Sequence, residues 1–259
     1  MFNFFKKKNP EKKINLDEKI VENYENIGLI AEYFYSETGI TFDKQMSILK
    51  NKVILFCKQK RIASCEQLLL DIKSDLNIKQ EIIDLLTTNE TYFYREFSQI
   101  EEVVLLAKHK NTDIRILCAP SATGEEPYSI AIALLESGVS SKQIKIVGID
   151  INHEALTKAK MAIYGERNVR NLSLNIRNKY FIEKEKKYIL NTNVKNLVTF
   201  ELVNIFDKSF TEFGKFDFIF SRNMLIYFDK ITKQKARDIL EKMRKDENQD
   251  IFFGHADLF

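Results

Sequence analysis

The sequence predicts an α/β protein in which a helical module precedes a parallel sheet. Up to about residue 87, apolar residues recur every three or four positions, which is the period of an amphipathic helix. After residue 110, short apolar runs alternate with helical stretches, and this alternation is typical of a parallel sheet covered on both faces. A chain of 259 residues with 44% hydrophobic residues can bury a core of that size.

The helical module is expected to span residues 16–87, after a basic N-terminal extension at residues 1–15. Apolar residues at helical spacing predict four helices, over 20–34, 46–57, 65–72 and 78–86. No run with the two-residue period of a strand occurs before residue 110. We therefore expect an all-helical first third.

The remaining elements follow in alternation. Strands are predicted at 114–118, 144–149, 216–220 and 251–253, and helices at 125–136, 152–164 and 230–245. Proline at position 127 is compatible with a helix because it falls in the first turn. Residues 165–200 interrupt the alternation, and short strands at 180–182, 187–190 and 197–200 are expected inside this insertion.

Composition excludes several classes of protein. A net charge of +3 is too small to indicate a nucleic-acid partner. The longest apolar run, Ile130 to Leu135, has six residues, whereas a membrane-spanning helix needs about 20, so no membrane insertion is expected. Three cysteines and three histidines lie at no recognisable ligand spacing, which predicts no metal site and favours a reducing, cytoplasmic location.

The loop at residues 119–128 joins the first predicted strand to its helix, where a doubly wound sheet binds its ligand. A dinucleotide site would need several glycines there, but only Gly124 is present, and Glu125 and Glu126 follow it. Acids in this turn repel a pyrophosphate and suit a cation, so S-adenosylmethionine, with its sulfonium and ammonium groups, is the candidate ligand. In the alternative interpretation, the two acids only complement the helix dipole.

Asp150 ends the second predicted strand, 26 residues after Gly124. An acid at this place can accept hydrogen bonds from both hydroxyls of a ribose. Asp can equally cap the helix that follows. Together with the acidic loop, however, it strengthens the case for an adenosyl ligand.

Six segments occur in an order that resembles a known family. They are LTTNETYFYRE at 86–96, ATGEEPYS at 122–129, GID at 148–150, VN at 203–204, SRNMLIYFD at 221–229 and FGH at 253–255. This series resembles the CheR family, the S-adenosylmethionine-dependent methyltransferases that esterify glutamates on chemotaxis receptors. The resemblance implies a Rossmann-like methyltransferase sheet over residues 88–259, a helical N-terminal domain that docks the receptor, and a small antiparallel subdomain inserted at about 165–200.

The resemblance also implies roles for individual residues. Cofactor-binding roles fall on Asn89, Thr91, Arg95, Glu126 (for the ammonium group), Asp150 (for the ribose), Asn204 and Ile205 (beside the adenine), and Arg222 and Asn223 (closing the pocket). Arg95 and Tyr227 are expected to face the methyl group and the substrate carboxylate. A glutamate, with a reference pKa of ~4.3, is already ionised at pH 7, so no general base and no group that titrates near neutrality is expected. The product would be S-adenosylhomocysteine.

A basic segment is expected to meet the receptor. Residues 44–64 hold six basic residues and no acid, and Lys50, Lys58 and Arg61 are the predicted docking residues. Receptor methylation helices are acidic, so this face would attract them. The alternative is an ordinary solvated helix face.

Departures from the family pattern limit the expected partners. The insertion looks short and has Glu183 to Lys187 where a turn containing glycine is usual, so capture of a receptor's C-terminal pentapeptide is not expected. Ala122 replaces a frequent serine. A monomer is expected.

Two other functions stay open: a catalytically weak relative that binds receptors or senses the cofactor, and a methyltransferase of another carboxylate substrate.

Overall fold

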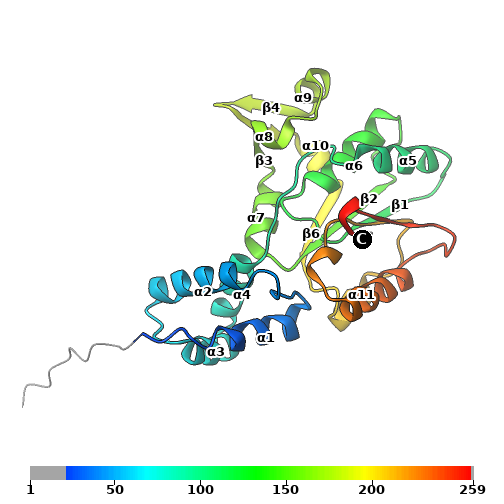
Figure 1. Cartoon of the computed structure of the whole chain (residues 1–259). Coiled ribbons are helices and arrows are strands. Elements are labelled where there is room, and N and C mark those ends of the chain that lie inside the picture. The colour runs from blue at the N-terminus through cyan, green and yellow to red at the C-terminus, as the bar shows by residue number, and fades with distance from the viewer. Residues whose placement is uncertain (1–21, 258–259) are drawn as a thin grey trace, which may run out of the picture.

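The computed structural model describes residues 22–257, so the expected extension at 1–15 lies outside the described residues. Helices α1 to α4 form one unit, a five-stranded sheet with its helices forms a second, and a small three-stranded sheet lies at the far end of the molecule from the helical unit (Figure 1). None of the helices within residues 22–257 combines the length and apolar character needed to cross a bilayer.

The helical unit contains the predicted helices with adjusted limits. They are α1 (Ile27–Thr38), α2 (Met46–Lys60), α3 (Cys65–Ser74) and α4 (Leu76–Leu86). The first helix starts later than the expected residue 20. It ends at Thr38, and the positive φ of 75° at Gly39 closes the last turn. Ser64 and Asp75 cap α3 and α4 by accepting hydrogen bonds from backbone N–H groups in the first turn.

The central sheet is parallel and has the order β6-β2-β1-β7-β8. Its strands are β1 (Ile114–Cys118), β2 (Ile144–Asp150), β6 (Val198–Leu202), β7 (Phe218–Ser221) and β8 (Ile251–Phe253). Helices α5 (Phe97–Ala107), α6 (Glu125–Glu136), α7 (His153–Met161) and α11 (Lys230–Lys242) accompany it. Short 3-10 turns occur at η1 (Lys208–Phe213), η2 (Leu225–Tyr227) and η3 (His255–Asp257).

The small sheet is antiparallel with the order β3-β5-β4. It comprises β3 (Ile163–Gly165), β4 (Phe181–Lys184) and β5 (Lys187–Leu190), with helices α8 (Glu166–Val169), α9 (Leu174–Tyr180) and α10 (Thr192–Lys195). The segment at 197–200, expected in this insertion, is wrongly placed: it belongs to β6 and pairs with β2 in the central sheet. The helix expected to reach residue 164 ends at Met161, and Ile163 begins β3.

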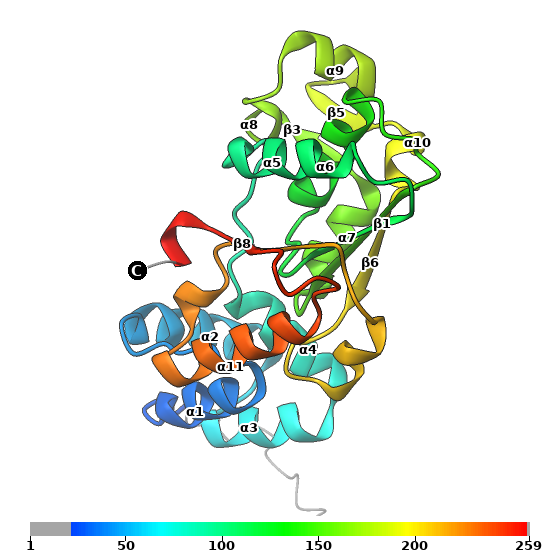
Figure 2. The same cartoon turned by 90° about the vertical axis from the view of Figure 1, so that its right-hand side faces the viewer.

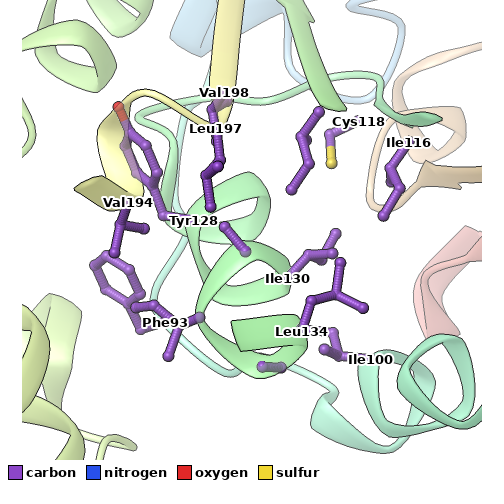
Figure 3. Close-up of a cluster of buried hydrophobic side chains, with 14 of the residues drawn as sticks. Phe93, Ile100, Ile116, Cys118, Tyr128, Ile130, Leu134, Val194, Leu197 and Val198 are labelled. Atoms are coloured by element: carbon purple, nitrogen blue, oxygen red, sulfur yellow. The ribbon is translucent and has the colours of Figure 1, made fainter. Parts of the chain in front are cut away.

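Alternate side chains of the central strands enter two different cores. Ile116 and Cys118 of β1 lie in a core with Tyr128, Ile130 and Leu134 of α6 (Figure 3). The intervening residue, Leu117, faces the opposite core, which contains Ala236 and Leu240 of α11. Because the sheet is covered on both faces, its strands are nearly continuous apolar runs.

Hydrogen bonds from both α4 and α1 join the helical unit to the sheet unit. At α4, Asp84 accepts hydrogen bonds from the backbone N–H groups of His153 (2.7 Å) and Glu154 (3.3 Å), the first residues of α7. At α1, Tyr35 donates to the carboxylate of Asp229, the N-cap of α11 (2.7 Å), and the two helices lie side by side in both views (Figures 1 and 2). The second strand therefore ends beside the helical unit.

Candidate active site

Two adjoining pockets lie at the carboxyl ends of the central strands. One contains Asp150 in its wall and the other contains Glu126, and they are named here after these residues. Both pockets share the same six residues along their common border: Thr88, Asn89, Pro120, Ala122, Asn223 and Tyr227. The pockets therefore form one elongated cleft, with Tyr227 where they meet.

Asp150 is held in place by backbone donors. Its side chain is 5% exposed, and its two oxygens accept hydrogen bonds from the N–H groups of Ala122 (2.8 Å) and Asn152 (2.9 Å). Burial raises the pKa of this carboxyl to about 6, although these two N–H groups oppose the rise. The contact to Ala122 fixes the loop after β1 to the end of β2, and the missing serine hydroxyl at 122 is not needed for it.

Glu126 forms a buried ion pair with Arg222. Glu126 is 7% exposed and Arg222 is 6% exposed, and the Arg222 Nε donates to Glu126 Oε2. The other oxygen, Oε1, is buried without a hydrogen-bond partner. Burial raises the pKa of the Glu126 carboxyl, and Arg222 opposes that rise. A carboxylate on a pocket-lining residue that keeps one buried oxygen without a partner is suited to an incoming ammonium group.

Arg222 also positions the segment that precedes α5. Its Nη1 donates to the backbone carbonyl of Arg95 (2.8 Å). Arg95 itself is half-buried, donates to the carbonyl of Glu90 (3.2 Å) and lines the Glu126 pocket with Thr91. The two arginines thus differ: both line the Glu126 pocket, but Arg222 is buried in an ion pair, whereas Arg95 is only half-buried.

The turn that carries Tyr227 is fastened by a residue that the sequence analysis missed. Asn223 has a positive φ of 60°, which asparagine tolerates. The carboxylate of Asp257 accepts hydrogen bonds from the N–H groups of Asn223, Gly254 (3.1 Å) and Ile226 (3.2 Å). Asp257 is 2% exposed, and burial raises the pKa of its carboxyl. Asp257 lies two residues after the FGH segment at 253–255, and the sequence analysis gave it no role.

Asn204 and Ile205 lie in the wall of the Asp150 pocket, as expected, but the amide of Asn204 has another partner. Its Nδ2 donates to the backbone carbonyl of Glu37 at the end of α1 (2.8 Å), and its Oδ1 accepts from Phe206 N–H (3.0 Å). Asn204 therefore ties the helical unit to the loop after β6. Ile205 is buried and supplies an apolar surface.

The helical unit contributes a wall of the Asp150 pocket that its sequence did not indicate. These residues run from the last residue of α1 to the N-cap of α2 and comprise Thr38, Ile40, Thr41, Phe42 and Gln45. Thr41 N–H donates to the carbonyl of Tyr227 (3.0 Å), which joins this wall to the turn that carries Tyr227. No motif marks these positions, because only tertiary packing brings them to the sheet.

Glu125, the other acid of the loop, faces away from both pockets. It is fully buried, and its carboxylate accepts hydrogen bonds from Thr123 Oγ1 (2.6 Å) and Asn168 Nδ2 (2.6 Å). Burial raises its pKa. The two neighbouring acids thus differ: Glu126 faces the site, and Glu125 joins the loop to the segment around α8.

The predicted docking residues lie on or next to α2, and all three are exposed. Lys58 lies 3.7 Å from the carboxylate of Glu22, and both side chains are more than half exposed. Arg61 follows α2 with a positive φ of 60°. None of the three lines either pocket. Among residues 22–257 there is also no group of three or more His, Cys, Asp or Glu arranged to hold a metal ion.

Comparison with known proteins decides the family. A family model described as "CheR methyltransferase, SAM binding domain" matches residues 89–259. The chain belongs to the CheR methyltransferase family. The "Chemotaxis protein methyltransferase" of Campylobacter jejuni strain 81-176 is 36% identical over 249 residues, covering 96% of this chain and 92% of that protein. The Salmonella typhimurium protein of the same name is 31% identical over 240 residues, with coverage of 89% and 82%.

As in other CheR methyltransferases, the cofactor is S-adenosylmethionine. The site fits this molecule on structural grounds: the unpartnered Glu126 Oε1 suits the ammonium group, and Asp150 lies in the adjoining pocket, where the ribose would bind. Glycine at position 148 lets the loop after β1 pack closely on β2, since a Cβ there would lie 2.8 Å from Ser121 Cβ and 2.9 Å from the Phe200 ring. The parallel sheet, the helical unit and the small antiparallel sheet agree with the predicted fold class.

Proposed function

We propose that this CheR methyltransferase esterifies glutamate side chains on the cytoplasmic domain of chemotaxis receptors. The observation that carries the proposal is the position of Tyr227, at the border of the Asp150 and Glu126 pockets and in the same pocket as Arg95. A carboxylate that enters beside Arg95 would meet the cofactor where these two pockets join. Two of the named relatives are chemotaxis methyltransferases, which supports a receptor as the substrate.

Each end of the cleft would hold one part of the cofactor. Asp150 would accept the ribose hydroxyls, and Ile205 would pack beside the adenine. Glu126 would bind the ammonium group with the oxygen that has no partner, while Arg222 keeps the carboxylate in place. When bound, the cofactor supplies an electrophilic methyl group on a sulfonium.

The protein's own part is to bring the nucleophile into line and to exclude water. Arg95 would orient the glutamate carboxylate, whose reference pKa of ~4.3 leaves it ionised at pH 7, so no proton has to be removed. The phenol of Tyr227 would orient the same group. The protein makes no general-base contribution, and alignment of this kind supplies roughly 7–11 kcal/mol.

Tyr227→Phe tests this assignment, because it removes only the hydroxyl. We expect turnover of a purified receptor cytoplasmic fragment to fall at least tenfold, while S-adenosylhomocysteine affinity by calorimetry stays within twofold. Tyr24→Phe is the matched control, since its hydroxyl bonds to Ile62 O in the helical unit, remote from both pockets. Full turnover in Tyr227→Phe would show that the phenol has no part in catalysis.

The product separates the proposal from its alternatives. Methyl ester formation is measured as base-labile tritium transferred from labelled S-adenosylmethionine to the receptor fragment. A wild-type protein that binds S-adenosylhomocysteine but labels no receptor would instead be the receptor-binding or cofactor-sensing relative. Labelling of small carboxylic acids alone, without labelling of the receptor fragment, would indicate a methyltransferase of another carboxylate substrate.

A further inference from the structure

An exposed arginine of the small-sheet unit stacks on a tyrosine that lines the Glu126 pocket. Arg170 directly follows α8, and its guanidinium carbon is 3.6 Å from the centre of the Tyr92 ring. Tyr92 is half-buried and lines the Glu126 pocket, and the Arg95 guanidinium is 5.7 Å from the same ring. Arg95, Tyr92 and Arg170 are called the mouth cluster below.

The mouth cluster joins two segments that are far apart in the sequence. The Phe93 N–H, next to Tyr92, donates to the carbonyl of Asn168 in α8 (2.9 Å). The pocket segment and the small-sheet unit are thus bonded through their backbones at this point, and Arg170 is held beside the pocket. A guanidinium stacked on an aromatic ring keeps a fixed plane, so less side-chain entropy is lost when it binds a carboxylate.

The charges of the mouth cluster are unpaired. No carboxylate among residues 22–257 lies within ion-pair distance of Arg95 or Arg170. Arg170 donates one hydrogen bond, to the carbonyl of Arg167 (2.5 Å), which leaves most of its five N–H donors available. The exposed acid in this pocket wall is Glu90, so the mouth keeps a net positive charge.

The basic segment at 44–64 is, in contrast, partly neutralised. Lys58 and Lys60 form ion pairs with the carboxylates of Glu22 and Glu81. These two lysines must exchange a carboxylate partner before they can bind an acidic substrate, whereas the side chain of Arg170 is bonded only to a backbone carbonyl.

We propose that Arg170 binds a second carboxylate of the protein substrate, on the segment next to the glutamate that is methylated. The inference rests on the proposed function and adds the substrate class: a protein segment with at least two carboxylates, one taken by Arg95 and one by Arg170. A substrate with a single carboxylate leaves Arg170 unused. The small-sheet unit then takes part in substrate recognition at the pocket itself.

The experiment compares Arg170→Gln with Lys142→Gln in the full chain. Lys142 is an exposed cation just before the amino end of β2, whereas both pockets lie at the carboxyl ends of the strands, and each variant loses one positive charge. With a purified receptor cytoplasmic fragment, the KM of Arg170→Gln should rise about tenfold and that of Lys142→Gln less than twofold. Arg170→Lys keeps the charge and should recover part of the loss.

Each remaining outcome has a defined meaning. Equal KM values for Arg170→Gln and Lys142→Gln would overturn the inference, even if the wild type methylates the receptor well. A drop in melting temperature or in S-adenosylhomocysteine affinity that accounts for the higher KM of Arg170→Gln would also overturn it, because Arg170 would then only stabilise the structure. If the wild type labels no receptor, the proposed function itself has failed.

Discussion

Acidification should weaken cofactor binding through Asp150. The carboxyl is 5% exposed, and burial raises its pKa to about 6 from an ordinary value of 3.8. Only the ionised form can accept hydrogen bonds from both ribose hydroxyls while it also accepts the N–H groups of Ala122 and Asn152. The fraction of protein competent to bind therefore falls as the pH drops through this pKa.

The size of the effect follows from that fraction. With a pKa of about 6, the carboxyl is almost fully ionised at pH 8 and about one-tenth ionised at pH 5. Because the apparent Kd is the intrinsic Kd divided by the competent fraction, it should rise roughly tenfold between pH 8 and pH 5, which is about 1.4 kcal/mol.

The assay is calorimetric titration from pH 5 to pH 8 with 5′-methylthioadenosine. This ligand keeps the ribose and adenine but lacks the amino-acid end of the cofactor, so Glu126, whose pKa is also raised, does not contribute. Asp150→Asn is the control, and its weaker binding should be independent of pH over this range. A flat profile for the wild type would refute the reasoning, since it would mean that the charge on Asp150 does not hold the ribose.

Two further predictions concern buried carboxylates that hold loops. Asp257→Asn leaves at least one of three backbone N–H groups without its acceptor, so the unfolding free energy should fall by about 1–3 kcal/mol. Turnover should also fall, because the turn that carries Tyr227 loosens. An unchanged unfolding free energy in chemical denaturation would contradict this prediction. For Glu125, burial raises the pKa above 4.5, so the folded state binds more protons than the unfolded state. The wild type should therefore lose stability relative to Glu125→Gln as the pH rises from 4.5 towards 7. Chemical denaturation that gives the same difference in unfolding free energy between the two proteins at every pH would disprove it.

The positions of Asp150 and Glu126 in the fold were predictable because short motifs at strand ends carry them. Asp150 and Glu126 occupy adjoining pockets, as the sequence indicated, since the carboxyl ends of parallel strands meet at one edge. The expectation that no group titrates near neutrality was incomplete. It considered histidine and cysteine, and the raised pKa of Asp150 comes from burial that only the folded structure shows.

The errors in the fold have local causes. Helix α7 ends at Met161, and the next residue, Ala162, has a positive φ of 54° and is fully buried, so the chain turns without the glycine or proline that usually marks a helix end. Strand β6 is at an edge of the central sheet and alternates buried and exposed residues at Val198, Thr199 and Phe200. That pattern is compatible with either sheet. Because the segment follows the insertion directly in the sequence, it was assigned to the small sheet, whereas it belongs to the central sheet.

The pocket wall from the helical unit could not be predicted, and it changes how that unit is understood. A unit that only docked the receptor would be independent of the cofactor. Here Gln45, the N-cap of α2, lines the Asp150 pocket, and Thr41 N–H bonds to the carbonyl of Tyr227. The same helix presents Lys50 and Lys58 to solvent. The start of α2 therefore lines the Asp150 pocket, and its outer face exposes two of the predicted docking residues, so a receptor that bound along α2 would contact an element that also forms this pocket.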